Sequence, residues 1–214
     1  MTTMLDRPES LGERLANTLS HGLGFLAVLI AAPILISAAM QRGSPSFVLG
    51  ASIYAITLAL LFCASTIYHA VPPGRLKNNL QVLDHAVIFL FIAGTYTPFT
   101  LGVLNGIWGW VLLGIVWGIA FAGVIFKLIG GAVRYLKIST TLYLVMGWLI
   151  LLVLYPMWEQ MPLAGILWLL AGGIAFTTGV IFFIADRPYD HFVWHLFVLT
   201  GVTCHFFAVL WHAA

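Results

Sequence analysis

Seven long apolar stretches dominate this chain, and they constrain its fold more than any other feature of the sequence. A helix crosses a bilayer core in roughly 20 residues. Only 7% of the 214 residues are charged and 62% are hydrophobic, so a water-soluble surface is excluded. The sequence therefore predicts an all-α, polytopic membrane protein, a seven-transmembrane helix bundle whose spans lie near residues 19–40, 46–70, 82–104, 107–129, 138–157, 162–184 and 190–212.

The chain is predicted to form a single domain, residues 1–214. Residues 1–18 form a short polar segment that lacks the pattern of a signal peptide, and we expect this segment to be cytoplasmic. Breaker-rich turns such as residues 71–75 join the spans. Both cysteines, Cys63 and Cys204, lie inside predicted spans, so no disulfide framework is expected.

The positive charges are distributed unevenly between the two sides of the predicted bundle. Eight of the nine Lys and Arg residues precede the first span or lie in the loops after spans two, four and six, whereas the other side has only Arg42. Because positive loop residues favour the cytoplasm, the N-terminus is predicted to be cytoplasmic and the C-terminus outside. The net charge of +2 is too small to indicate a nucleic-acid partner.

Three histidines fall within spans that should be buried in lipid: His69, His191 and His195. Ionisable side chains are costly inside a bilayer, so such a group indicates a functional site. His191 and His195 lie four residues apart on one helix face, and the predicted orientation places His69 at the same cytoplasmic level. A single histidine such as His69 is equally well explained by a hydrogen bond to a neighbouring helix, but three at one depth favour a shared metal ion.

Zinc is the metal that this pattern favours. Three histidines plus a water molecule form the open type of zinc site found in enzymes, whereas structural sites usually fill all four positions with protein ligands. Zinc can lower the pKa of its bound water to about 7, which supplies hydroxide near neutral pH. We therefore predict a zinc site near the cytoplasmic face of the membrane.

Two further polar side chains, Ser65 and Asp84, are predicted at the same depth. Ser65 lies one turn from His69 on the same helix face, and Asp84 lies near the start of the third span, where a carboxylate could accept a proton from water. Two alternatives stay open. Ser65 could bond back to the carbonyl four residues earlier, and Asp84 could cap the third helix.

The other histidines are weaker candidates. His205 lies ten residues beyond His195, which places it about 15 Å deeper along the helix, too far away to share the ion. His21 and His85 could pair with polar neighbours such as Asn17 or with loop backbone. They could also contact the ligands without binding the metal.

These residues resemble a known family. The haemolysin III family has motifs similar to Ser65-x-x-x-His69, to Leu83-Asp84-His85 followed by residues 93–99, to His191-x-x-x-His195 and to residues 13–22. That family belongs to the progestin and adipoQ receptor group, which is related to alkaline ceramidases. The resemblance implies a seven-helix bundle in which His69, His191 and His195 hold zinc on the cytoplasmic side, beside Asp84 and Ser65.

The residues and the resemblance together predict a zinc-dependent hydrolase of the cell membrane that cleaves an amide or ester bond of a membrane lipid and serves lipid homeostasis. Asp84 would act as general base and then proton donor, and Ser65 would position the water or the oxyanion. The expected partners are the bilayer and a lipid substrate that enters from it, and no oligomeric state is predicted. The alternatives are a receptor or sensor with a structural zinc and, less favoured, a pore-forming haemolysin.

Overall fold

The computed structural model describes residues 9–104, 106–130, 135–185 and 187–213, and within these residues the chain is helical and has no strand. Seven spans are long and apolar enough to cross a membrane, as predicted. One of them, the fifth, consists of three consecutive pieces. The elements are α1 (Leu11–Gln41), α2 (Pro45–Ala70), α3 (Arg75–Gly102), α4 (Ile107–Gly130), α5 (Leu136–Trp148), the 3₁₀ helix η1 (Leu149–Val153), α6 (Leu154–Gln160), α7 (Leu163–Ala185) and α8 (Asp190–His212).

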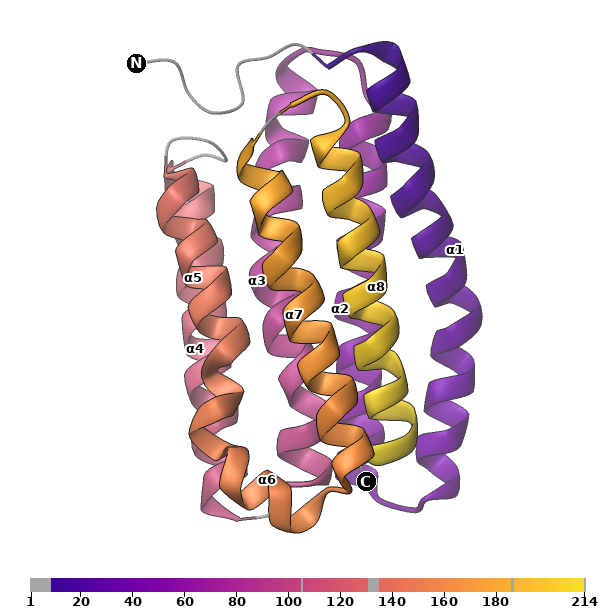
Figure 1. Cartoon of the computed structure of the whole chain (residues 1–214), viewed down its shortest axis with the longest axis vertical. Coiled ribbons are helices and arrows are strands. Elements are labelled where there is room, and N and C mark those ends of the chain that lie inside the picture. Colours follow the sequence, from indigo (N-terminus) through magenta and orange to yellow (C-terminus); the bar gives the residue numbers. More distant parts are fainter. Residues whose placement is uncertain (1–8, 105, 131–134, 186, 214) are drawn as a thin grey trace.

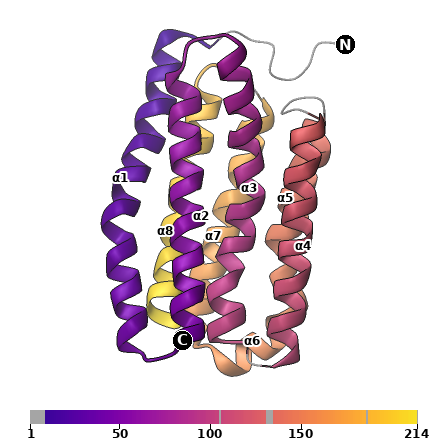
Figure 2. The same ribbon diagram turned by 180° about the vertical axis from the view of Figure 1, so that it is seen from behind.

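The long helices stand side by side along the long axis of the molecule (Figures 1 and 2). The helix α2 packs between α1 and α3, α4 packs on α3, and α7 packs on α8. The last helix, α8, returns to pack against α1. We call the end of the bundle at which α1 and α8 begin the proximal end, at the top of Figure 1. Because α2 also ends there, residues that are far apart in the sequence meet at the proximal end.

The first helix begins at Leu11, well before the start predicted from hydropathy. Ser10 and Glu13 form a capping box, in which the Ser10 hydroxyl accepts from the Glu13 N–H at 3.2 Å and the Glu13 carboxylate accepts from the Ser10 N–H at 3.0 Å. Residues 11–18 of the polar segment are thus helical. Their buried polar side chains, Glu13 and Asn17, carry no hydropathy signal.

The fifth span is interrupted by η1, and the Tyr96 side chain stabilises the interruption. The Tyr96 hydroxyl accepts from the Ile150 N–H at 3.0 Å and donates to the Met146 carbonyl at 2.7 Å, with the Gly147 carbonyl 2.8 Å away. Backbone groups without partners are costly in a membrane, so an irregular segment at this depth needs such a partner. Hydropathy alone predicts an unbroken helix here.

Small residues allow close packing of neighbouring helices. A Cβ at Gly50 of α2 would lie 2.8 Å from the Cα of Pro98 in α3. At Gly172 of α7 an added Cβ would collide with the His205 ring of α8, whereas at Gly173 it would only touch Trp148 at ordinary distance. Neighbouring helices therefore approach closely at some glycines, such as Gly50 and Gly172, and not at others.

Candidate metal centre

Three histidines meet at the proximal end of the bundle. His69 lies in the last turn of α2, and His191 and His195 lie one turn apart at the start of α8. One ring nitrogen from each residue lies within 4.8 Å of the others, close enough for the group to hold a metal ion. His69 and His195 are each only 1% exposed. The structure thus places together the three histidines that the sequence predicts as metal ligands.

The hydrogen bonds of these rings leave nitrogens available for a cation. The Nε2 atom of His69 is buried and has no hydrogen-bond partner among the described residues. On the other side of this ring, Nδ1 lies 3.2 Å from the Glu9 carboxylate. The Nδ1 atom of His195 lies 2.9 Å from the Ser20 hydroxyl, so its Nε2 is the nitrogen left for a ligand. A buried polar atom without a partner is costly, and a bound cation would remove that cost at His69.

Ser65 and Asp84 lie beside this group. The Ser65 hydroxyl is 2.7 Å from Nδ1 of His21, and Ser65 and the buried Asp84 line the same cavity. A bond from Ser65 back to its own helix is not found among the described residues. Asp84 lies in the third turn of α3, which begins at Arg75, so the alternative that it caps this helix is wrong.

The helix α1 contributes His21 to the centre. The His21 ring stacks on the His195 ring, with centroids 3.4 Å apart and planes 10° apart, and it pairs with Ser65 instead of Asn17. His85 faces Phe183, and its backbone carbonyl accepts from a tyrosine hydroxyl. These two histidines therefore surround the predicted ligands without belonging to the group of three.

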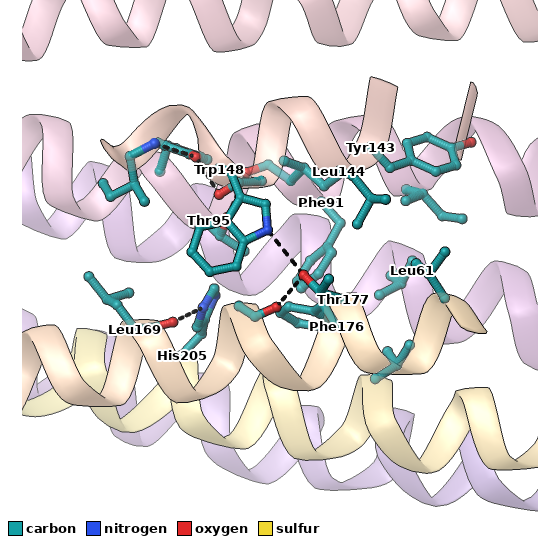
Figure 3. A pocket seen from close by; sticks show the side chains of 18 of the residues that line it. Leu61, Phe91, Thr95, Tyr143, Leu144, Trp148, Leu169, Phe176, Thr177 and His205 are labelled. Carbon is teal, nitrogen blue, oxygen red and sulfur yellow. Dashed lines mark hydrogen bonds between the residues drawn. The ribbon is translucent and has the colours of Figure 1, made fainter. Parts of the chain in front are cut away.

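A cavity of about 290 Å³ extends from the centre between α3, α5, α7 and α8. Ser65, Asp84, His191 and His195 line one part of it, and most of the remaining lining is apolar. Figure 3 shows a stretch of this cavity away from the centre. There the Trp148 ring donates to the Thr177 hydroxyl at 3.1 Å, and His205 lies 3.3 Å from the Leu169 carbonyl oxygen (Figure 3). His205 is thus separate from the group of three, as expected.

Sequence reasoning missed two polar residues that contact the ligands, Glu9 and Ser20. Burial would raise the pKa of the Glu9 carboxyl, but His69, Lys77 and Asn17 together lower this pKa to about 2. Glu9 is therefore ionised at neutral pH. No periodic or hydropathy signal marks Glu9, because it precedes the first helix. Ser20 could have been found, since it adjoins His21 in the opening motif.

The chain is thus a seven-span membrane protein with a buried three-histidine group that can hold a metal ion. Residues 11–206 match the family described as Haemolysin-III related. The chain is 41% identical over 201 residues to Hemolysin-3 of Bacillus cereus, a match that covers 94% of this chain and 91% of that protein. It belongs to the haemolysin III family.

Two further relatives extend this result. The Hemolysin-3 homolog of Bacillus subtilis (strain 168) is 39% identical over 204 residues, with 95% of each chain covered. The human Monocyte to macrophage differentiation factor is 32% identical over 212 residues, with 92% of this chain and 83% of that protein covered. The human relative fits the predicted grouping with the progestin and adipoQ receptors.

Proposed function

We propose that this protein is a zinc-dependent hydrolase that cleaves an amide or ester bond of a membrane lipid. The observation that carries the proposal is the placement of the three-histidine group, Asp84 and Ser65 beside an apolar cavity inside a membrane-spanning bundle. A metal-ligand set that served packing alone would not require a cavity next to it.

The donor set fits zinc, because imidazole nitrogens suit zinc and three protein ligands leave one position for reaction. A zinc ion held in this way polarises a carbonyl oxygen and lowers the pKa of a bound water to about 7. His69, His191 and His195 would hold the ion through the nitrogens that converge at the proximal end.

Asp84 would take up the proton that the attacking water loses and pass it to the leaving nitrogen or oxygen. The C–N or C–O bond then breaks, and the products are a carboxylic acid and an amine or alcohol. Ser65, which lies 2.7 Å from Nδ1 of His21 and lines the same cavity as Asp84, would hold the water in place.

The apolar cavity supports a lipid substrate, since it can receive a hydrocarbon chain while the scissile carbonyl lies at the histidines. We place the protein in the cell membrane with the proximal end at the cytoplasmic face, because the loops at that end carry nearly all the positive charge. The substrate would enter from the bilayer, and its hydrolysis would serve membrane lipid homeostasis.

The test is the Asp84→Asn variant of the purified protein, compared with wild type for zinc content and for cleavage of N-acyl lipids by mass spectrometry. We expect full zinc content and a rate at least about 100-fold lower, as for loss of a general base. Hydrolysis by Asp84→Asn at the wild-type rate would remove Asp84 from the mechanism.

Two other functions share the same site and are separated by further measurements. A receptor or sensor with a structural zinc predicts that His191→Ala lowers thermal stability while wild-type protein cleaves no lipid. The name of the Bacillus cereus relative, Hemolysin-3, favours a lytic protein. In that case pure wild-type protein would release dye from liposomes even after zinc is removed.

A further inference from the structure

Glu9 and the first turns of α1 contact two of the three histidines. Glu9, just before α1, places Oε1 at 3.2 Å from Nδ1 of His69. Ser20, in α1, places its hydroxyl at 2.9 Å from Nδ1 of His195. Residues 9–20, which include the start of α1, therefore contact two of the three proposed ligands, one in α2 and one in α8.

The Glu9 carboxylate is itself fixed by two other side chains. The Asn17 amide donates to Oε1 at 2.6 Å, and the Lys77 ammonium donates to Oε2 at 3.2 Å. Asn17 is buried in α1 and Lys77 lies in the first turn of α3. Since both oxygens have a donor, the carboxylate keeps its orientation toward His69.

Chemistry assigns a role to this arrangement. A neutral imidazole carries one proton, and only the other nitrogen can bind a metal. A carboxylate can only accept, so Glu9 keeps the His69 proton on Nδ1 and leaves the Nε2 lone pair free. Nε2 is buried without a hydrogen-bond partner among the described residues, and Nδ1 has only the 3.2 Å ion-pair contact with Glu9. Carboxylate partners of this kind orient metal-binding histidines and raise their basicity.

We propose that Glu9 is a positioning residue of the metal centre, which fixes the ring orientation and tautomer of His69, and that Ser20 does the same for His195. The proposal rests on the proposed function only in taking the three histidines as a metal site. A plain surface ion pair between Glu9 and Lys77 is the competing explanation, and such a pair contributes little to stability.

The same segment also anchors the third ligand indirectly. The Glu13 carboxylate accepts from the backbone N–H of Tyr189 at 3.0 Å, two residues before His191. Tyr189 adopts a left-handed conformation with φ of 64°, which the bond to Glu13 helps to hold. The turn that leads into α8 is therefore tied to α1 close to the metal centre.

The test measures metal binding by full-length purified protein without any turnover. Zinc affinity is obtained by competition with a chelator, and the visible spectrum of the cobalt-substituted protein reports the geometry of the site. For Glu9→Gln we expect zinc affinity to fall about 10–100-fold and the cobalt bands to shift. The control is Glu159→Gln, which makes the same change at an exposed position of α6 and should match wild type.

Ser20 provides a second, independent variant pair. We expect Ser20→Ala to weaken zinc binding and Ser20→Thr, which keeps the hydroxyl, to restore it. We also expect metal-free Glu9→Gln to unfold at nearly the wild-type temperature, because Glu9 acts through His69 and not through packing. Wild-type zinc affinity and an unchanged cobalt spectrum in both Glu9→Gln and Ser20→Ala would overturn the proposal.

These outcomes separate this inference from the proposed function. If zinc binding depends on Glu9 but no lipid is cleaved, the positioning role holds and the hydrolase proposal fails. If lipid is cleaved but zinc binding does not change in the Glu9 and Ser20 variants, the hydrolase proposal holds and the positioning role fails.

Discussion

At the scale of single residues, the hydrogen bond on one side of a histidine ring decides what its other side can do. His195 has Ser20 behind it and keeps a nitrogen for the centre. His205, on the same helix, instead lies against the Leu169 carbonyl of α7. A carbonyl only accepts, so the nearby His205 nitrogen must carry the proton. His195 and His205 lie in the same helix, yet only His195 belongs to the group that can hold a metal ion.

This difference predicts that substitution by glutamine weakens zinc binding at His195 but not at His205. His195→Gln would remove one of the three proposed ligands, so zinc affinity should fall by more than the roughly 10–100-fold expected for loss of an outer partner. His205→Gln should keep one zinc per chain, because His205 does not belong to the group of three. Competition with a chelator measures the zinc affinity of His195→Gln, and elemental analysis measures the zinc content of both purified variants. Equal loss of zinc in both variants would contradict the assignment of ligands.

How far the centre can be predicted from sequence also depends on individual residues. The spacing of His191 and His195 fixes their shared face, and loop charge places His69 at the same depth, so these three can be found without coordinates. Glu9 cannot, because its contact with His69 depends on how α1 packs against α2. The pairing of His21 with Ser65 is missed for the same reason. The sequence shows which residues are neighbours along the chain, such as Asn17, but not which residues meet between helices.

At the scale of helices, hydropathy does not reveal where a helix ends, where it is interrupted or where two helices pack closely. Particular side chains determine these features. The existence of all seven spans follows from apolar length. Their ends do not, because capping by Ser10 extends α1 through polar residues. The break in the fifth span depends on the Tyr96 hydroxyl, which comes from α3. Contacts of this kind, between residues far apart in the sequence, cannot be predicted from a local stretch of sequence.

The contact between α2 and α3 gives a prediction at this scale. In Gly50→Ala the new methyl group would meet the backbone of Pro98 and the carbonyl of Thr97, which cannot move aside as a flexible side chain could. We expect the stability to fall by about 1–3 kcal/mol, the usual cost of overpacking. Gly118→Ala in α4 is the control, since no atom lies within 4 Å of the added carbon. Thermal unfolding in detergent compares the two, and equal midpoints would refute the close contact.

At the scale of the whole molecule, the three-histidine group and the side chains that contact it lie together at the proximal end. His69 lies in the last turn of α2 and His191 in the first turn of α8, so the centre joins helices that are far apart in the sequence. The α1 helix packs against both and supplies Ser20 and His21. The proposed chemistry would therefore take place near one end of the bundle, and the orientation of the bundle would determine which compartment supplies water and zinc.

That sidedness can be measured with two exposed positions at opposite ends of α2. Ser46 lies in its first turn and Pro73 in the loop that follows it. In a background with Cys63→Ala and Cys204→Ala, we expect a membrane-impermeant thiol reagent to label Ser46→Cys in intact cells. Pro73→Cys should react only after the membrane is permeabilised, because Arg75 and Lys77 follow it at the start of α3 and positive residues next to a span favour the cytoplasm. Labelling of Pro73→Cys in intact cells, with Ser46→Cys protected, would place the metal centre at the outer face instead.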